Sequence, residues 1–142
     1  MNKWEQNMNN EISKELSVFK GNAKSISTIK GETVEEKKKL YNAIQNCDVR
    51  INDIVGQTIS VKDIYVREYE KKDLDENGNP RIGHTTILFD EAGKTYVTAS
   101  NYFFNAITQI LVSVGNLDTP IKIKIIKKPT KTGTESLSAQ WV

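Results

Sequence analysis

Apolar residues first recur at helical spacing, ahead of any strand-like pattern. Leu40, Ile44 and Cys47 lie three or four residues apart and would share one face of a helix. Thr33-Val-Glu-Glu36 precedes them and matches a capping box, in which the threonine hydroxyl and the glutamate carboxylate each accept a hydrogen bond from a backbone amide. The pattern predicts a short amphipathic helix over residues 34–47.

A period of two follows, but its phase slips by one residue at about Asp63. Before the slip Ile59 and Val61 share one face, and after it Ile64 and Val66 share one. A strand that changes faces in its middle is bulged or sharply bent, as happens where one strand serves two sides of a β-barrel. The slip therefore predicts a long, bent first strand.

Turn signals divide the rest of the chain into shorter elements. Asn77-Gly78 and Ala92-Gly93 are typical of tight turns, and they bound strands over "RIGHTTILFDE" and "KTYVTA". Two last strands are expected at residues 121–128 and about 134–142. Between the strand over "KTYVTA" and the strand at residues 121–128, an apolar stripe that ends before Gly115 predicts a helix. The stripe consists of Phe103, Ala106, Ile107, Ile110, Leu111 and Val114.

The order of three strands, a helix and two strands, with a long bent first strand, is the order of the OB-fold. We therefore expect a mainly β chain, a five-stranded OB-fold barrel with a helix between strands 3 and 4 and an extra N-terminal helix. Other small α+β domains could share this order. An OB-fold binds its ligands on the open face of its early strands, between the loops after strands one and four.

One domain is expected, because 142 residues can build one hydrophobic core and hardly two. We place it at residues 32–142, with the N-terminal helix included. Residues 1–31 are polar, and Ile12, Leu16 and Phe19 form only a weak helical stripe. We expect this segment to be loosely held or disordered.

The composition is that of an ordinary soluble globular protein, and the residues offer little support for an enzyme. No apolar run approaches the ~20 residues of a membrane span, and the N-terminus lacks the apolar core of a secretion signal. Cys47 and His84 are the only residues of their types, so they cannot assemble a zinc site of the usual kind. A single cysteine suits a reducing cytoplasm. We expect no enzymatic activity, no cofactor and no metal; a metal-dependent nuclease built on acidic pairs in the turns is the weaker alternative.

The segment "DLDENGNPRIGH" resembles the opening of an EF-hand calcium loop. Asp73, Asp75, Asn77 and Gly78 stand at the expected positions, but the twelfth residue, which should be a bidentate glutamate, is His84. Strand-like residues flank the segment on both sides. It is therefore interpreted as a hairpin loop without a calcium site.

Lysine dominates one face of the fourth predicted strand. In "PIKIKIIKKPTKTG", residues 120–133, isoleucine and lysine alternate, and the stretch contains no carboxylate. If the isoleucines at 121, 123 and 125 line the core, Lys122 and Lys124 face outward beside the loop that carries Lys127, Lys128 and Lys131. The net charge of the whole chain is only +2, so the position of these lysines is the informative feature.

Alternation predicts a second set of outward residues on the first three strands. With Ile64 and Val66 inward, the first strand would expose Tyr65, Arg67 and Tyr69. With Ile87 and Phe89 inward, the second strand would expose His84 and Thr86. With Thr95, Val97 and Ala99 inward, the third strand would expose Lys94, Tyr96 and Thr98.

Cations beside exposed aromatic rings are what single-stranded nucleic acid requires, because lysine and arginine bind phosphates and rings stack on unpaired bases. These residue types do not separate DNA from RNA. Tyrosine is also common in strands and lysine on wet surfaces, so a β-barrel protein-interaction or virion module is the alternative. The candidate nucleic-acid-binding residues are Tyr65, Arg67, Tyr69, Arg81, His84, Lys94, Tyr96, Lys122, Lys124, Lys127, Lys128, Lys131 and Trp141.

The stretch "TTILFDEAGKTYVTAS", followed by an apolar helix, a glycine and "PIKIKIIKKPTKTG", resembles single-stranded DNA-binding proteins of tailed bacteriophages over roughly residues 26–142. The resemblance implies an OB-fold and a role in phage DNA replication or recombination. It also implies sequence-independent coating of single strands in the host cytoplasm, with other phage replication proteins as candidate partners. Bacterial members of the wider class end in an acidic tail, whereas this sequence ends "SLSAQWV", so recruitment through such a tail is not expected.

Overall fold

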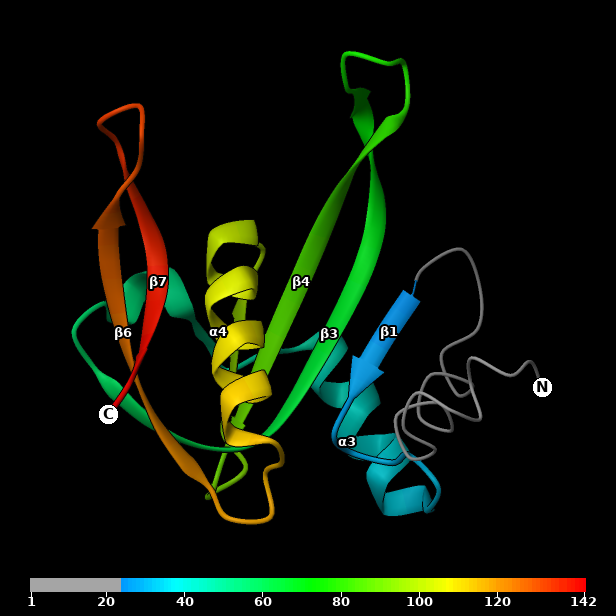
Figure 1. The fold of residues 1–142 in the computed structure, drawn as a ribbon. Helices are drawn as coiled ribbons and strands as arrows, with labels where there is room; N and C mark the ends of the chain where they lie inside the picture. The colour runs from blue at the N-terminus through cyan, green and yellow to red at the C-terminus, as the bar shows by residue number, and fades with distance from the viewer. Residues whose placement is uncertain (1–23) are drawn as a thin grey trace.

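The computed structural model describes residues 24–142 (Figure 1). Strand β1 (Lys24–Ser27), helix α3 (Val34–Gln45), strand β2 (Val49–Arg50) and the short 3-10 helix η1 (Ile51–Ile54) come first. They are followed by β3 (Thr58–Leu74), β4 (Pro80–Asp90), β5 (Thr95–Thr98), α4 (Asn101–Val114), β6 (Ile121–Pro129) and β7 (Glu135–Trp141). The predicted stripe of Ile12, Leu16 and Phe19 lies outside the described residues.

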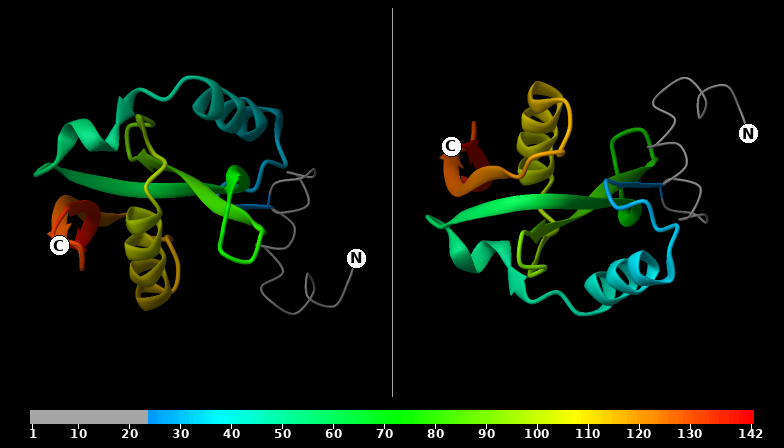
Figure 2. Two further views of the ribbon diagram at one scale, coloured as in Figure 1. Left: turned by 90° about the horizontal axis from the view of Figure 1, so that it is seen from above. Right: turned by 90° about the horizontal axis from the view of Figure 1, so that it is seen from below.

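All the strands of residues 24–142 belong to one sheet with the order β2-β5-β4-β3-β6-β7, and β1 also pairs with β3. Only β2 and β5 run parallel; the other pairs are antiparallel. The sheet curls into an open half-barrel (Figures 1 and 2). Helix α4 packs against β4 and β7, on the inner side of the curl. In the described part of the chain, neither helix is long and apolar enough to cross a membrane.

Strand β3 is the long bent strand that the phase slip predicted. Its register with β4 shifts between Val61 and Asp63, which is where the apolar pattern changes face. The bend lets one edge of β3 pair with two strands: β6 at residues 58–61 and β1 at residues 65–68. The prediction of a bulge at this position is confirmed.

The helix predicted from the capping box is also confirmed, with its last residue at 45 instead of 47. The amide of Glu36 donates to Thr33 Oγ1 at 3.1 Å, and the amide of Thr33 donates to Glu36 Oε1 at 3.2 Å. Leu40 and Ala43 are its buried residues. Ile44 is exposed instead, so the helix presents a narrower apolar face than the sequence pattern indicated.

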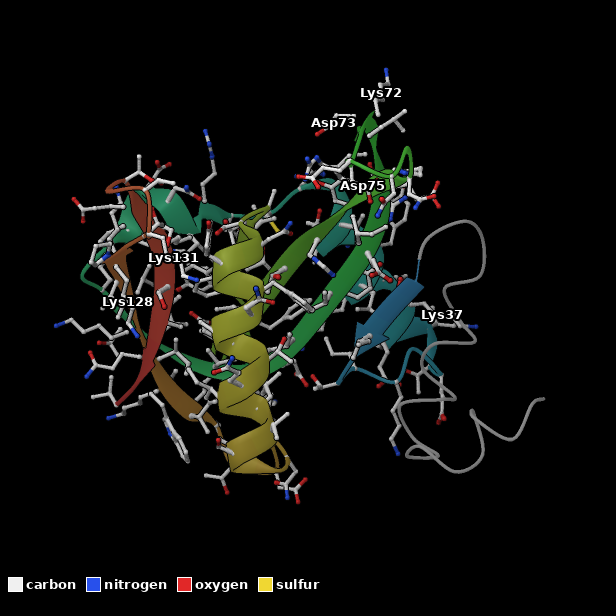
Figure 3. All side chains as sticks on the ribbon, turned by 45° about the horizontal axis from the view of Figure 1, so that its top comes forward. Lys37, Lys72, Asp73, Asp75, Lys128 and Lys131 are labelled. Carbon is white, nitrogen blue, oxygen red and sulfur yellow. The ribbon has the colours of Figure 1, made fainter. Side chains whose placement is uncertain are left out.

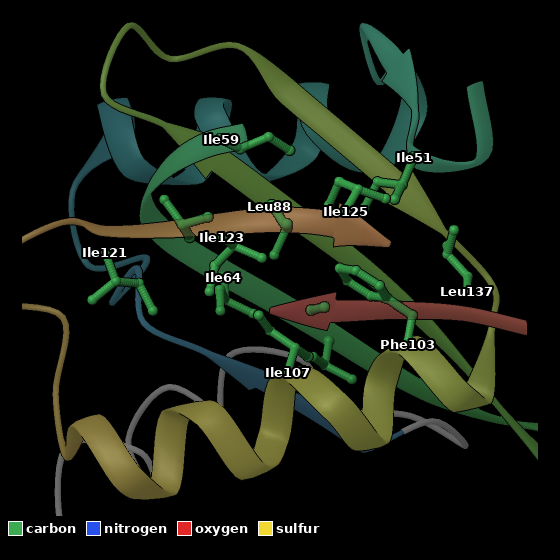
Figure 4. Close-up of a cluster of buried hydrophobic side chains, with 13 residues drawn as sticks. Ile51, Ile59, Ile64, Leu88, Phe103, Ile107, Ile121, Ile123, Ile125 and Leu137 are labelled. Atoms are coloured by element: carbon green, nitrogen blue, oxygen red, sulfur yellow. The ribbon is translucent and has the colours of Figure 1, made fainter. Parts of the chain in front are cut away.

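The core has two parts on opposite faces of the sheet. The larger part fills the curl between the sheet and α4 and includes Leu88, Phe103, Ile107 and Ile123, all fully buried (Figure 4). The smaller part lies outside the curl, beneath α3, and consists of Ile29, Leu40, Ala43, Tyr65, Ile87 and Phe89. Strand β4 is therefore covered on both faces.

Among residues 24–142 the sheet contains seven strands, where the sequence predicted five. Strand β1 lies in the segment that was predicted to be loosely held, yet Ser25, Ser27 and Ile29 are each at most 5% exposed. Serine side chains carry no apolar alternation, and β2 has only two residues, so neither strand produces a periodic signal. The described chain is mainly β, with a curled open sheet and two α-helices.

Candidate nucleic-acid interface

Helix α3 covers the outer face of β3, β4 and β5, which is the face predicted to bind nucleic acid. Tyr65 on this face is only 3% exposed and packs with Ile87 and Phe89. Lys39 links α3 to the sheet by an ion pair and a cation–π contact. Its Nζ lies 3.6 Å from Asp63 Oδ2 and 5.2 Å from the centre of the Phe89 ring. The predicted exposure of Tyr65 is wrong, because the large apolar residues beside it require a cover of their own.

Strand β5 turns its tyrosine toward the inner core instead of toward solvent. Tyr96 is paired with Leu88 across the sheet, and its hydroxyl donates to Asp90 Oδ2 at 2.9 Å. Burial, followed by this hydrogen bond to a carboxylate, raises the pKa of Tyr96 to about 12. Thr86 and Thr98 are also buried. The outward facing predicted for these three residues is therefore wrong.

His84 is largely buried, with 17% of its side chain exposed, and its ring packs against helix α4. Its ring stacks on Phe104 of α4 with centroids 3.8 Å apart and planes 6° apart. Nδ1 lies 3.0 Å from Asn101 Oδ1, and Nε2 lies 3.7 Å from Glu68 Oε1. These contacts tie α4 to the β3–β4 pair, so the predicted open position of His84 is also wrong.

Four further candidates are exposed or partly exposed: three on the β3–β4 hairpin and one in the turn before β5. Arg67 is exposed, and half-buried Tyr69 lays its ring against Gly83 of β4, where an added Cβ would come within 2.5 Å of the ring. Arg81 is exposed and pairs with Asp73 at 3.7 Å. Lys94 is exposed, and its charge contributes to lowering the pKa of Asp48. Arg67 and Tyr69 lie two residues apart on β3 and share one of its faces, whereas Lys94 lies in the turn before β5.

The lysines of β6 lie as the alternation predicted. Ile121, Ile123 and Ile125 are buried, whereas Lys122 and Lys124 are exposed between them. The exposed Lys127 and Lys128 follow on β6, and Lys131 lies in the turn before β7 (Figure 3). None of the five pairs with a carboxylate among residues 24–142. The β6 pairing places Lys127 opposite Leu137 and Lys128 opposite Ser136, so adjacent lysines point to different faces of the hairpin.

The turn between β6 and β7 repeats the backbone geometry of the two other hairpin turns without their carboxylate. Each turn spans five residues. In the first turn, the amide of Asp75 donates to the carbonyl of Asn79, and the carbonyl of Asp75 accepts from the amide of Gly78. The turns that begin at Asp90 and Thr130 have the same two backbone hydrogen bonds. Gly78, Gly93 and Gly133 occupy the fourth position with φ of 80°, 87° and 86°.

The side chain at the first position distinguishes the three turns. Asp75 and Asp90 each accept hydrogen bonds from two backbone amides of their turn. Thr130 instead donates its hydroxyl to the carbonyl of Thr134 at 3.0 Å and lies 3.0 Å from Thr132 Oγ1. The lysine-bearing turn is thus stabilised by neutral hydroxyls. The turn from Asp75 has the hairpin form that was predicted for the EF-hand-like segment, and its carboxylate is already bonded to amides.

A surface pocket of about 460 Å³ lies between this turn and the first turn of α4. Its lining includes Tyr102, Lys128, Lys131, Ser136 and Leu137. Tyr102 is 60% exposed, because it lies off the buried stripe that holds Phe103 and Ile107. The sequence reasoning missed Tyr102; the available signal was a large aromatic residue outside the apolar stripe of a helix.

Trp141, the last aromatic candidate, is 49% exposed near the end of β7 and pairs with Ile123 in the sheet. In the described part of the chain, no group of three or more histidine, cysteine, aspartate or glutamate residues could hold a metal ion. Burial raises the pKa of the Cys47 thiol, which donates a hydrogen bond to the carbonyl of Ala43 at 3.1 Å. The pocket at the β6–β7 turn thus brings together Tyr102, Lys128 and Lys131 with several threonine and serine residues.

A family model described as phage single-stranded DNA-binding protein matches residues 20–141. The chain belongs to this family. Comparisons with curated proteins and with solved structures gave no match. The family match begins ahead of β1, so it includes the covering helix α3 as well as the curled sheet.

Proposed function

We propose that this phage single-stranded DNA-binding protein holds its ligand along the β6–β7 hairpin and does so with little regard to sequence. It would coat and protect transient single strands during phage DNA replication and recombination in the host cytoplasm. The proposal includes the assignment of the curled sheet to the OB-fold class, with β3, β4, β5, β6 and β7 as its five strands and α4 between the third and the fourth.

One observation supports the site most directly: the five lysines of the hairpin are exposed and have no carboxylate beside them in sequence from residue 120 to residue 134. The rest of the chain mixes its charges, since 20 basic residues face 18 acidic ones. A net charge of +2 provides little attraction over a distance. A local excess of lysines attracts phosphates within about one Debye length, roughly 8 Å in physiological salt.

The neutral turn strengthens this reading of the hairpin. An aspartate would suit the first position of the turn, as Asp75 and Asp90 show in turns of the same geometry. At the tip of the β6–β7 hairpin that position holds Thr130, beside Lys131. The turn is therefore closed without placing a negative charge among the lysines. Hydroxyls can in addition donate hydrogen bonds to phosphate oxygens.

A titration of labelled oligo-dT against the full chain at several salt concentrations tests the proposal. Each phosphate neutralised on a single strand contributes about −0.7 to the slope of log affinity against log salt. Engagement of four or five lysines predicts a slope of roughly −3, and mixed-sequence oligonucleotides should bind with similar affinity. An absence of binding at low salt would overturn the function, and an affinity independent of salt would overturn the electrostatic mechanism. Oligo-U in the same titration shows whether RNA binds equally well.

A further inference from the structure

We propose that the pocket between Tyr102 and the β6–β7 turn is a subsite for one nucleotide, whose base stacks on the Tyr102 ring while its flanking phosphates contact Lys128 and Lys131. This inference rests on the proposed function and adds to it the place where a base is held. The lysines alone explain attraction to phosphates, but they provide no platform for a base.

Tyr102 is 60% exposed, whereas Tyr65 is buried and Tyr69 and Tyr96 are partly buried. Tyr65 is buried under α3, with its hydroxyl 3.4 Å from Ser25 Oγ, and the Tyr96 hydroxyl is bonded to Asp90. Tyr102 leaves more than half of its surface in solvent while its neighbour Phe103 is fully buried. An exposed ring that contributes little to the core is available for stacking.

The chemistry around the ring fits a nucleotide. Two lysines line the pocket, together with Thr130, Thr132, Ser136 and Ser138, and no aspartate or glutamate does. A volume of about 460 Å³ is within the range of small-molecule sites, roughly 300–1,000 Å³. Stacking on an aromatic ring beside cations is how proteins hold unpaired bases without reading their identity, because every base has a π face.

The chain provides a matched control in Tyr41 of α3. Tyr41 is 65% exposed, close to the 60% of Tyr102, and Lys37 and Lys38 lie one helical turn before it. It therefore has a similar ring and nearby lysines, but it does not line the pocket at the β6–β7 turn. A difference in affinity between the two alanine variants would therefore be due to the pocket, and not to the loss of an exposed tyrosine in general.

The experiment compares the wild type with Tyr102→Ala, Tyr102→Phe and Tyr41→Ala on two ligands: oligo-dT and an oligonucleotide of equal length with abasic sites, which keeps the phosphates and lacks the bases. Tyr102→Ala should weaken oligo-dT binding about fivefold or more, with an unchanged salt slope and unchanged binding to the abasic ligand. Tyr102→Phe and Tyr41→Ala should bind oligo-dT as the wild type does. Circular dichroism should show the same fold in all variants.

Three results would overturn the subsite: wild-type affinity of Tyr102→Ala for oligo-dT, an equal loss on both ligands, or an equal loss in Tyr41→Ala. Each of these leaves the lysine-dependent binding of the wild type in place. A wild type that binds no single strand at low salt would instead overturn the proposed function itself. The two failures are therefore distinguishable in one set of titrations.

Discussion

The β3–β4 and β6–β7 hairpins project on either side of α4 (Figure 1) and close with the same turn geometry, yet their surfaces differ in charge. Over residues 68–82 the β3–β4 hairpin carries five acidic and three basic residues. Over residues 121–141 the β6–β7 hairpin carries five lysines and one glutamate. Similar backbones thus support opposite electrostatics, and the difference is made by side chains that the fold does not require.

The two hairpins also differ at their bases. Helix α3 covers the outer face of β3 and β4, where Tyr65, Ile87 and Phe89 are buried. The outer face of β6 is uncovered and presents Lys122 and Lys124 to solvent. We propose that the base of the β3–β4 hairpin has a structural role and that the β6–β7 hairpin binds the ligand. Four experiments test this division, beginning with the largest expected effect.

Replacing the buried tyrosine at the base of the β3–β4 hairpin should damage stability and not binding. Tyr65→Ala removes a ring that is 3% exposed, and comparable large-to-small core changes cost about 3–5 kcal/mol. Chemical denaturation should show this loss in the free energy of unfolding, whereas Tyr41→Ala should show almost none. A Tyr65→Ala variant of normal stability that no longer binds single strands would mean that the outer face is open to DNA.

Charge reversal should separate the two hairpins in affinity. Lys124→Glu with Lys128→Glu changes two exposed lysines, so the fold should persist while affinity for single strands of any sequence falls about tenfold or more. The salt slope should flatten by roughly one or more, because two phosphate contacts are lost.

The matched control reverses Lys72 and Arg81, two exposed cations of the β3–β4 hairpin. The exposed ion pair between Arg81 and Asp73 contributes little to stability. This double variant should bind nearly as the wild type does. An equal loss of affinity in both double variants would show that the strand runs over both hairpins, and a loss only in the control would reverse the assignment.

Exchange of the turn residues should give a smaller effect with the same direction. Thr130→Asp copies the side chain of Asp75, so the turn should form normally, but the added charge lies beside Lys131. We expect an affinity about threefold lower at low salt, and no change for Asp75→Thr. Titrations with oligo-dT measure both. An unchanged affinity in Thr130→Asp would show that the neutral turn has no part in binding.

The smallest effect is expected at Asp48, which lies between α3 and β2 and is hydrogen-bonded to β5. The Asp48 carboxylate accepts hydrogen bonds from the Thr95 amide at 2.9 Å and from the Thr95 hydroxyl at 3.0 Å, and these bonds lower the pKa of Asp48. Because the pKa is lower in the folded chain than in the unfolded one, Asp48 stabilises the fold at neutral pH. That contribution is lost as the pH falls through the folded-state pKa.

Asp48→Asn should therefore reduce the drop in unfolding free energy between pH 7 and acid pH. Thermal unfolding of wild type and variant across that range measures the difference, and single-strand binding at pH 7 should stay the same in both. An identical pH dependence of the two proteins would show that the Asp48 hydrogen bonds to Thr95 do not contribute to stability.

Local patterns predicted a large part of this fold. The capping box at Thr33 and Glu36, the tight turn at Gly78 and the face change near Asp63 each depend on a few neighbouring residues, and all three are present. The alternation of isoleucine and lysine on β6 also predicted correctly which side chains are buried. Strand β1 was missed, because small serines, and not an apolar alternation, fill its buried positions.

The sequence by itself determined which residues share a face, and the tertiary structure decided what each face meets. Periodicity placed Tyr65 and Ile64 on opposite faces of β3, and both residues are buried. Tyr65 is covered by α3 on the outer face, and Ile64 lies in the core on the inner face. Likewise, α4 had to pack against β7 before Tyr102 could lie beside Lys128 and Lys131, which are more than 25 residues away. Burial depends on contacts between distant segments, and a local period contains no information about them.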